Sequence, residues 1–459
     1  MKSSNIACMF LAVFGAVSSA AGASIDGSAV DFSAGAGPVK PVNGVGQPPI
    51  QGYVGFKMFR YLKDAGIPYS RLHDVGGAYG KNVFVDIPNL FRDFDADETD
   101  PASYDFAFTD RLINALVENG VEPYFRLGVT IENAHYVKAY RIHPPKDFAK
   151  WARICEHVIR HYTEGWANGF RHKITHWEIW NEPENMETIE KNSMWKAPFS
   201  EYIRLYSVAS KHLKAKFPHL KIGGYASCGF YGVGSSWGKP DNPRVKFLMD
   251  AFTNFLDHAR AEKMPLDFFS FHCYDKPAFA GRQIEHCRRT LDAYGFTATE
   301  MSLNEWLPSS GVNMLGTPRQ AAEIAAMLAI LQNGPVDDAE IYDARCGTGA
   351  YSPLFNCLTF RPHKAYYVYL AFNELRRLGT AARVKGPLPD GVWMCAAMDA
   401  AGARGAVFVV NLSKEALTLP PSFGGKKVVR ARAVDAGHDF AAAPSDVAPP
   451  DSVVLLDVE

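Results

Sequence analysis

The 459-residue sequence lacks an excess of charge of either sign, because 48 Lys and Arg residues balance 49 Asp and Glu residues to a net charge of −1. Proteins that bind nucleic acids, or that adhere electrostatically to membranes, carry clustered basic charge. The composition therefore predicts no nucleic-acid partner. Hydrophobic residues make up 47% of the chain, a content that excludes intrinsic disorder for most of it.

Long hydrophobic runs are also missing, apart from one near the N-terminus. The run from Ile6 to Val17 follows Lys2 and leads to small residues that end at Ala23. It is shorter than the roughly 20 apolar residues that span a bilayer. The pattern predicts a signal peptide over residues 1–23. We therefore expect a secreted or periplasmic protein whose mature chain has no membrane span.

Cysteine is sparse and does not form metal-binding patterns. Seven cysteines follow the predicted signal peptide and none lies in a Cys-x-x-Cys pair, so no zinc site is expected. Cys346 and Cys357 flank a glycine-rich loop and would be bridged in an oxidising compartment. Two buried free thiols are the alternative. No metal or other cofactor is predicted.

What the sequence does contain, from about residue 40 to residue 378, is an alternation of short apolar runs and helical patterns. The strand candidates are 41–46, 68–73, 122–127, 173–180, 220–225, 266–272, 297–305 and 339–343. Helices are expected at 53–65, 106–119, 147–162, 200–213, 244–262, 281–294 and 318–332. Eight such repeats predict an α/β fold, a (β/α)8 TIM barrel. A doubly wound sheet is the alternative, but no Gly-x-Gly-x-x-Gly turn follows the first strand.

The pattern changes after Leu378. Short β-rich runs separated by Gly, Pro and Asp occur at 392–397, 405–412, 427–434 and 452–458. They predict a small antiparallel, β-sandwich-like domain. The expected organisation is a barrel over residues 24–378 and an accessory β-domain over residues 379–459, with residues 24–40 able to add a strand to the β-domain.

Two acidic residues lie at the ends of predicted barrel strands, where barrel enzymes place their chemistry. Glu182 ends the run Trp-Glu-Ile-Trp-Asn-Glu and Glu305 ends the seventh strand. Two carboxyl groups at one barrel mouth allow glycoside hydrolysis, in which one protonates the leaving oxygen and the other attacks the anomeric carbon. Burial is expected to raise the pKa of the acid. The adjacent Trp180 and Trp306 are predicted to face the sugar or shape the site.

The Asn-Glu-Pro motif after strand four, together with a Glu at the end of strand seven, resembles the clan A glycoside hydrolases. The run Trp177 to Pro183 resembles family 39 most, a family that includes β-xylosidases and α-L-iduronidases. The resemblance covers most of residues 40–459. It implies that Glu182 is the acid/base, that Glu305 is the nucleophile, and that Asn181 binds the 2-hydroxyl of the sugar.

The resemblance also assigns roles at other strand ends. His272 and Tyr274 match the clan's His-x-Tyr element, so that His272 would face the sugar or the acid and Tyr274 would orient the nucleophile. Arg71 matches the strand-two arginine that keeps the nucleophile ionised, and His73 is expected to touch the substrate.

The sequence departs from the family in two places. Asn304 precedes Glu305 where the family more often has Thr, and residues 340–345 lack the tryptophan that usually forms a sugar platform. Tyr342 or Arg345 is expected to replace that platform. Both departures concern the substrate more than the reaction.

Several assignments have alternatives. Glu300, earlier in the seventh strand, could be the nucleophile instead, and Glu178 and Glu184 are expected to be supporting or loop acids. A structural ion pair is the alternative role for Arg71, and core packing is the alternative for His272.

Together these features predict a retaining glycoside hydrolase that removes a pentose from plant-type oligosaccharides by exo action, as β-xylosidases do. An α-L-arabinofuranosidase or another arabinosyl or uronosyl hydrolase is the alternative within the class. A uronate is disfavoured because the sequence shows no basic cluster. A non-catalytic carbohydrate-binding barrel and a metal-dependent barrel hydrolase are the alternatives from other classes. The expected partner is an uncharged carbohydrate.

Overall fold

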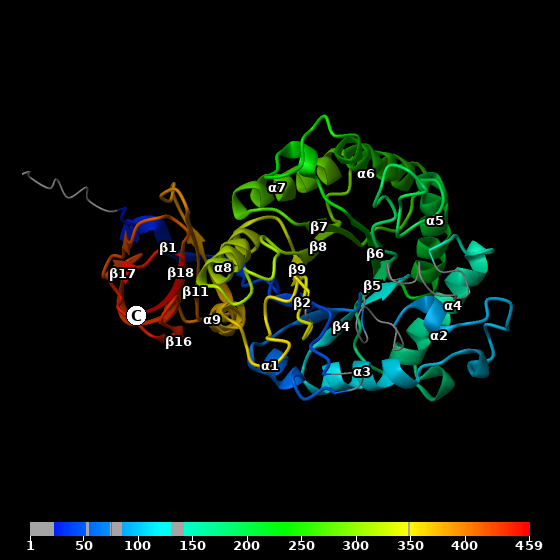
Figure 1. Cartoon of the computed structure of the whole chain (residues 1–459), viewed down its shortest axis with the longest axis horizontal. Helices are drawn as coiled ribbons and strands as arrows, with labels where there is room; N and C mark the ends of the chain where they lie inside the picture. The colour runs from blue at the N-terminus through cyan, green and yellow to red at the C-terminus, as the bar shows by residue number, and fades with distance from the viewer. Residues whose placement is uncertain (1–22, 52–54, 74, 76–84, 130–141, 348) are drawn as a thin grey trace, which may run out of the picture.

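Eight parallel strands close into a barrel in chain order, within the residues that the computed structural model describes: 23–51, 55–73, 75, 85–129, 142–347 and 349–459 (Figure 1). The strands are β2 (Gly44–Gly46), β3 (Tyr69–Arg71), β4 (Glu122–Leu127), β5 (His176–Ile179), β6 (Lys221–Ser227), β7 (Phe268–Cys273), β8 (Glu300–Trp306) and β9 (Asp338–Ile341). Each corresponds to a predicted strand, and the (β/α)8 fold is confirmed. Residues 1–22 of the predicted signal peptide lie outside the described part.

Helices surround the barrel (Figure 1). They are α1 (Phe59–Asp64), α2 (Ile87–Leu90), α3 (Ala107–Glu118), α4 (Phe148–Thr163), α5 (Phe199–Lys216), α6 (Pro243–Ala261), α7 (Pro277–Ala293), α8 (Pro318–Asn333) and α9 (Lys364–Leu378). The side chains of Asp147, Asn242 and Thr317 accept backbone N–H bonds in the first turns of α4, α6 and α8. These caps satisfy donors that a helix start otherwise leaves unpaired, which is why the helices begin where they do. The first helix begins at Phe59 rather than at the predicted residue 53.

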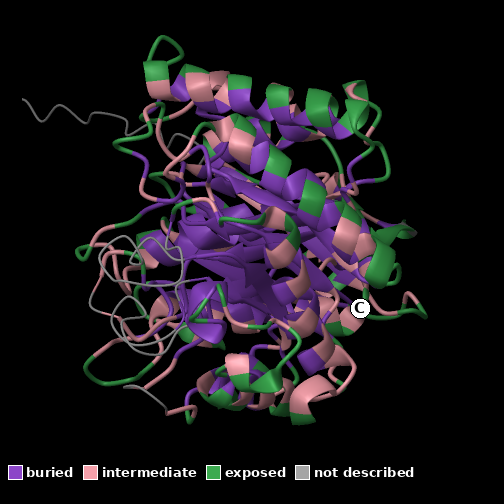
Figure 2. Ribbon diagram, turned by 90° about the vertical axis from the view of Figure 1, so that its right-hand side faces the viewer, coloured by how far each residue is buried: buried purple, intermediate pink, exposed green. Residues whose placement is uncertain are grey.

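The barrel strands are buried, whereas the helices expose one face (Figure 2). Parallel strands covered by helices must be apolar along their length, which explains the continuous apolar runs in the sequence. A polar residue near the carboxyl end of such a strand reaches the barrel mouth instead of the core.

An antiparallel sheet lies beside α8 and α9 (Figure 1). Its strands are β1 (Val30–Pro38), β10 (Thr380–Val384), β11 (Val392–Met398), β12 (Gly405–Asn411), β18 (Ser452–Val458), β15 (Lys426–Val434), β14 (Ser422–Phe423) and β16 (Asp439–Ala442), while β13 (Leu417–Thr418) and β17 (Val447–Ala448) pair separately. The N-terminal segment supplies β1, which pairs antiparallel with β10.

Side chains of this sheet alternate between two cores. Phe408 and Val410 of β12 belong to the barrel's hydrophobic core, whereas Val407 and Val409 pack into a separate core inside the β-domain. The period of two residues is that of a strand buried on both faces. The β-domain is therefore fixed to the outer side of α8 and α9. The described residues include no helix long and apolar enough to cross a bilayer.

Candidate active site

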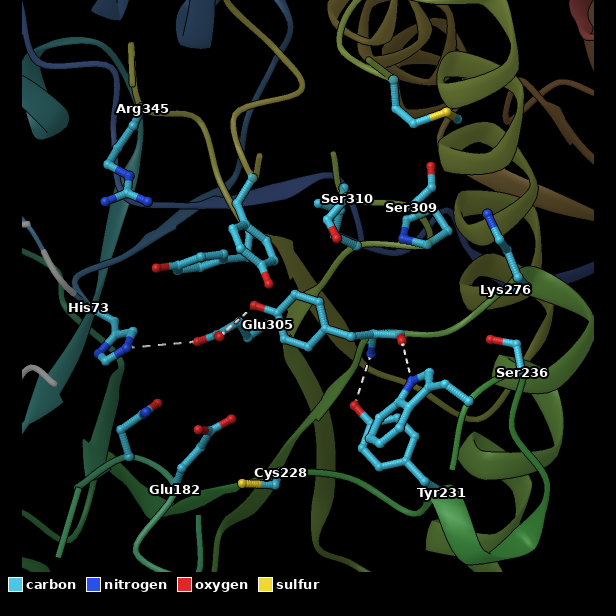
Figure 3. A pocket seen from close by; sticks show the side chains of 18 of the residues that line it. His73, Glu182, Cys228, Tyr231, Ser236, Lys276, Glu305, Ser309, Ser310 and Arg345 are labelled. Atoms are coloured by element: carbon cyan, nitrogen blue, oxygen red, sulfur yellow. Dashed lines mark hydrogen bonds and ion pairs between the residues drawn. The ribbon is translucent and has the colours of Figure 1, made fainter. Parts of the chain in front are cut away.

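A cleft of about 820 Å³ lies at the carboxyl ends of the barrel strands (Figure 3). Seven of the residues predicted from the sequence line it: His73, Asn181, Glu182, Tyr274, Glu305, Tyr342 and Arg345. They follow or end five different strands. The barrel thus brings together residues that are up to 272 positions apart in the chain.

Glu305 is held by two donors. The Tyr274 hydroxyl donates to Oε1 at 2.6 Å, and Nη1 of Arg71 donates to Oε2 at 2.9 Å. The ring of His73 lies 4.0 Å from the same Oε2. These two hydrogen bonds fix the orientation of the buried carboxylate. The geometry therefore suits Glu305 to nucleophilic attack.

Arg71 lies behind this carboxylate rather than in the cleft. Its side chain is buried, with Nε donating to Glu178 at 2.8 Å and Nη2 donating to Asn181 Oδ1 at 2.5 Å. Burial lowers the pKa of Arg71, but Glu178 and Glu305 raise it above the usual value, so the cation persists. These acceptors occupy the guanidinium away from the cleft, so Arg71 holds Glu305 and is not placed to contact a substrate.

The same network orients Asn181. Because arginine can only donate, the amide oxygen of Asn181 accepts the bond and its nitrogen is left as the donor. Asn181 lines the cleft, so this amide N–H₂ group can serve a sugar hydroxyl. Glu178 is fully buried and also accepts a hydrogen bond from Ser270 at 2.5 Å, so it anchors the Arg71 side chain that holds Asn181 and Glu305.

Glu182 is paired with His272. The ring Nδ1 of His272 lies 2.7 Å from Oε1 of Glu182, and Asn185 donates to Oε2 at 2.7 Å. Glu182 itself has φ of 43°, in the left-handed region that non-glycine residues seldom adopt. Such strained residues gather at functional sites, where the surrounding structure holds them in place.

The pKa of Glu182 is lowered, contrary to the expectation from burial alone. Burial raises it, but the contact with His272 and the bond from Asn185 outweigh this. Burial lowers the pKa of His272, yet the negative charges of Glu305 and Glu182 raise it above its usual value. The pair therefore holds its proton on His272, and protonation of a leaving group requires transfer across the 2.7 Å contact.

The other acids take no place in the cleft. Glu300 begins β8 at the opposite end of the barrel, where Lys221 donates to both of its oxygens at 2.6 Å. That position removes Glu300 as an alternative nucleophile. Glu184 is fully buried and accepts the backbone N–H of Cys228 at 2.8 Å. Burial raises its pKa to about 7.

Two groups of described residues have metal-ligand spacing. One oxygen of Glu182, one ring nitrogen of His272 and one oxygen of Glu305 lie within 4.8 Å of one another. The other group is His176, Glu300 and Asp338, at the opposite end of the barrel. In each group a cation already neutralises a carboxylate, Arg71 at Glu305 and Lys221 at Glu300, an arrangement that opposes metal binding.

Neither predicted tryptophan reaches the cleft. Trp306 is fully buried, because adjacent strand residues point to opposite faces and Glu305 takes the one toward the mouth. Trp180 is also fully buried; its indole N–H donates to Met194 O at 3.0 Å, and its ring packs edge-on against Trp195. These two rings therefore do not face the sugar, and the alternative, that they shape the site from behind it, stays a prediction.

The predicted platform residues Tyr342 and Arg345 both line the cleft. The Tyr342 hydroxyl accepts a bond from Gln47 at 3.0 Å, and the Arg345 guanidinium lies over the Tyr342 ring and pairs with Asp343 at 2.7 Å. Cys346 and Cys357, a candidate disulfide, are free thiols in the structure.

The segment after β6 contributes cleft residues that the sequence did not predict. Tyr231 and Trp237 of the loop and Arg244 in the first turn of α6 line the cleft, as does Tyr351 from the segment after β9. Loops have no periodicity, so no pattern pointed to them. The available signal was position, because Tyr231 and Trp237 follow a barrel strand closely, where functional loops begin.

Known proteins resemble the chain in sequence and in fold. A sequence profile for "Glycosyl hydrolases family 39" matches residues 64–291, about half of the chain. A β-xylosidase of Geobacillus stearothermophilus is 26% identical over 223 residues, which make up 46% of this chain but only 39% of that protein. The profile match includes Glu182 and His272 and ends before Glu305, so the place of Glu305 rests on geometry.

Solved structures share the fold over nearly the whole chain. A glucosidase from Croceicoccus marinus has a TM-score of 0.70 at 18% identity, covering 94% of this chain and 98% of that one. A monomeric β-xylosidase from Caulobacter crescentus CB15 has a TM-score of 0.65 at 16% identity, with the same coverage. At these identities the likeness concerns the fold alone.

Proposed function

The chain belongs to glycosyl hydrolase family 39, in clan A, and from that premise we propose that it is a retaining, exo-acting glycosidase with β-xylosidase-like activity. The observation that carries the proposal is the approach of Glu182 and Glu305, of which one oxygen each lies within 4.8 Å of the other. Retaining glycosidases hold their carboxyl groups about 5–5.5 Å apart, whereas inverting enzymes need about 6.5–9.5 Å to admit a water.

In the first step, Glu305 would attack the anomeric carbon while Glu182 protonates the departing oxygen. Arg71 and Tyr274 hold the Glu305 carboxylate in position by hydrogen bonds. The proton reaches Glu182 from His272, and the bond from the anomeric carbon to the leaving oxygen breaks as the ester to Glu305 forms.

In the second step, Glu182 would remove a proton from water, and the resulting hydroxide oxygen displaces Glu305 from the anomeric carbon. Two inversions restore the original configuration. His272 can take up the proton again from Glu182, because its pKa is raised by the same two carboxylates. The enzyme returns to its starting protonation state.

A neutral sugar fits the charges of the cleft. Of the Lys and Arg residues that line it, Lys276 pairs with Glu323 at 3.0 Å and Arg345 pairs with Asp343 at 2.7 Å, while Arg244 donates to the backbone oxygen of Asn185 at 2.9 Å. Two of these three cations are thus paired with carboxylates, which favours a neutral sugar over a uronate. The β-xylosidase relative favours a xylosyl substrate over the arabinosyl alternative.

The test has two arms. Proton NMR during hydrolysis of an aryl β-D-xyloside should show β-xylose as the first product, and α-xylose would refute retention. An activated 2-deoxy-2-fluoro-xyloside should trap an ester on the peptide that contains Glu305, identified by mass spectrometry. A label on Glu182 would reverse the assignment. Turnover of aryl arabinosides or uronides in place of xylosides would overturn the sugar and leave the mechanism intact.

We also propose that the protein is exported, which rests on the hydrophobic run before Ala23. Expression of the full chain in a host with an export pathway should yield an extracytoplasmic protein that begins near Ser24. Retention of residues 1–23 on a cytoplasmic product would refute this.

A further inference from the structure

One tryptophan stands apart from the buried ones. Trp237 is 49% exposed and lines the cleft that holds Glu182 and Glu305. A large aromatic ring that stays half-exposed in a functional cleft leaves apolar surface in contact with water. Covering that surface with a ligand is favourable, so such a ring marks a binding surface.

The indole is fixed in position by hydrogen bonding. Its Nε1–H donates to the backbone oxygen of Tyr274 at 3.0 Å, and the hydroxyl of Tyr231 accepts the backbone N–H of Tyr274 at 3.1 Å. The rings of Tyr231 and Trp237 lie 4.2 Å apart between centroids. Both loop residues are thus tied to the residue whose hydroxyl holds the nucleophile.

The loop that presents Trp237 is also fixed from below. Ser236 donates its hydroxyl to Asp275 at 2.6 Å, and Gln283 of α7 donates to Asp275 at 3.1 Å and to Gly234 O at 3.0 Å. Asp275 and Gln283 are buried. A ring held in this way loses little conformational freedom when a ligand covers it, which is the condition for a preformed binding surface.

The cleft has a deep end and a shallow end. His73, Asn181 and Tyr342 are buried and surround the catalytic candidates, whereas Trp237 is half-exposed. Figure 3 shows Tyr231 and Ser236, the neighbours of Trp237, toward one end of the cleft, and His73 and Glu182 toward the other. In an exo-acting enzyme the terminal sugar occupies the deep end, so the remainder of the substrate extends to the shallow end.

We propose that the exposed face of Trp237 is the platform on which the leaving-group sugar stacks, so that the enzyme selects oligosaccharides over simple alkyl glycosides. The ligand is a neutral sugar ring, whose C–H face is apolar and whose hydroxyls point outward to solvent. This proposal rests on the proposed exo-glycosidase function and adds the residue that recognises the part of the substrate beyond the scissile bond.

The experiment compares kcat/KM for xylobiose and for methyl β-D-xyloside, which share the terminal sugar and differ in the leaving group. Trp237→Ala should reduce the ratio of kcat/KM for xylobiose to kcat/KM for the methyl xyloside by about tenfold. This is the loss expected when on the order of 60 Å² of apolar contact between ring and sugar is removed, at about 25 cal/mol per Å². Most of the loss on xylobiose should fall on KM. Trp237→Phe, which keeps a ring and loses the N–H, should retain most of the wild-type ratio.

Tyr231→Phe is the matched control, because it removes the hydroxyl that holds Tyr274 and leaves the ring in place. An effect transmitted through Tyr274 to Glu305 would reduce kcat/KM for both substrates by the same factor and leave their ratio unchanged. If Trp237→Ala also leaves the ratio unchanged, Trp237 is only a support for Tyr274 and the proposal is overturned.

A second readout uses an aryl xyloside as donor and xylose as acceptor. Transfer to xylose, relative to hydrolysis, should fall by about tenfold in Trp237→Ala, because the acceptor occupies the same platform. An unchanged partition would overturn the proposal. Failure of the proposed function would look different, because the wild-type chain would then hydrolyse neither xylobiose nor the methyl xyloside.

Discussion

The role of Glu182 can be isolated by varying the leaving group. Its carboxyl lies 2.7 Å from His272 and 2.7 Å from Asn185, at the edge of the cleft. Glu182→Ala should reduce kcat/KM for xylobiose by about 10²–10⁴-fold, the range that general acid catalysis contributes. That loss corresponds to about 3–5.5 kcal/mol of transition-state free energy. For dinitrophenyl xyloside, whose leaving group needs little protonation, we expect less than a tenfold loss.

The assay is kcat/KM for a series of aryl xylosides, plotted against the pKa of the leaving phenol. Glu182→Ala should give a much steeper slope than the wild-type enzyme. Azide should accelerate the variant and form β-xylosyl azide, since it enters where the carboxyl was and needs no base. The same anion added to Glu305→Ala should form the α-azide, because only one displacement then occurs.

Glu184→Gln is the control for this series. Glu184 is buried two residues further along the same loop and holds the Cys228 backbone N–H. Damage to the loop alone would lower kcat/KM for all leaving groups by one factor and leave the slope of the plot unchanged. If Glu182→Ala gives that uniform loss, Glu182 is not the proton donor and the reasoning fails.

Four further outcomes are expected. Burial raises the pKa of Glu184 to about 7 from 4.5, so the folded state keeps a proton that the unfolded chain releases, and stability falls as pH rises through that window. In Glu184→Gln the free energy of unfolding, measured with urea, should lack this pH dependence, which amounts to about 3 kcal/mol in the wild-type protein. A variant with the same pH dependence as the wild type would contradict this prediction. Arg71→Met should lower the free energy of unfolding by about 3–5 kcal/mol, because the buried carboxylate of Glu178 loses the cation that pairs with it. Adding Glu178→Gln should restore part of that loss, and no recovery would count against the ion pair. Trp180→Phe should lower the free energy of unfolding, measured by thermal denaturation, by about 1–3 kcal/mol and leave KM unaltered. A raised KM would indicate that Trp180 contacts the substrate. EDTA should not affect turnover, and a loss reversed by one divalent metal would favour a metal-dependent hydrolase.

The sequence predicted the barrel well because parallel strands leave a strong signature. Strands such as Phe268–Cys273 are covered on both faces and read as apolar runs, and helices such as Phe148–Thr163 show a buried stripe after a capping Asp147. The predicted start of the first helix, at residue 53, is wrong, since residues 53–58 have helical apolar spacing but offer no capping side chain. Its N-cap position, Met58, makes no side-chain cap bond.

What the sequence by itself determined was which residues stand at the barrel mouth. A carboxyl at the end of a parallel strand must lie at the same edge as all the other strand ends, so Glu182 and Glu305 were bound to meet. His272 and Tyr274 follow from the same rule. Each of these inferences needs only the order of strands along the chain.

Only the tertiary structure decided what surrounds those residues. The direction of a side chain depends on the register and twist of its neighbours, so Trp180 and Trp306 turned into the core while Trp237 came to line the cleft from a loop without periodicity. The sign of the pKa shift of Glu182 depended on a histidine 90 positions away that lies 2.7 Å from it. Electrostatic interactions act through space, and a sequence records only distance along the chain.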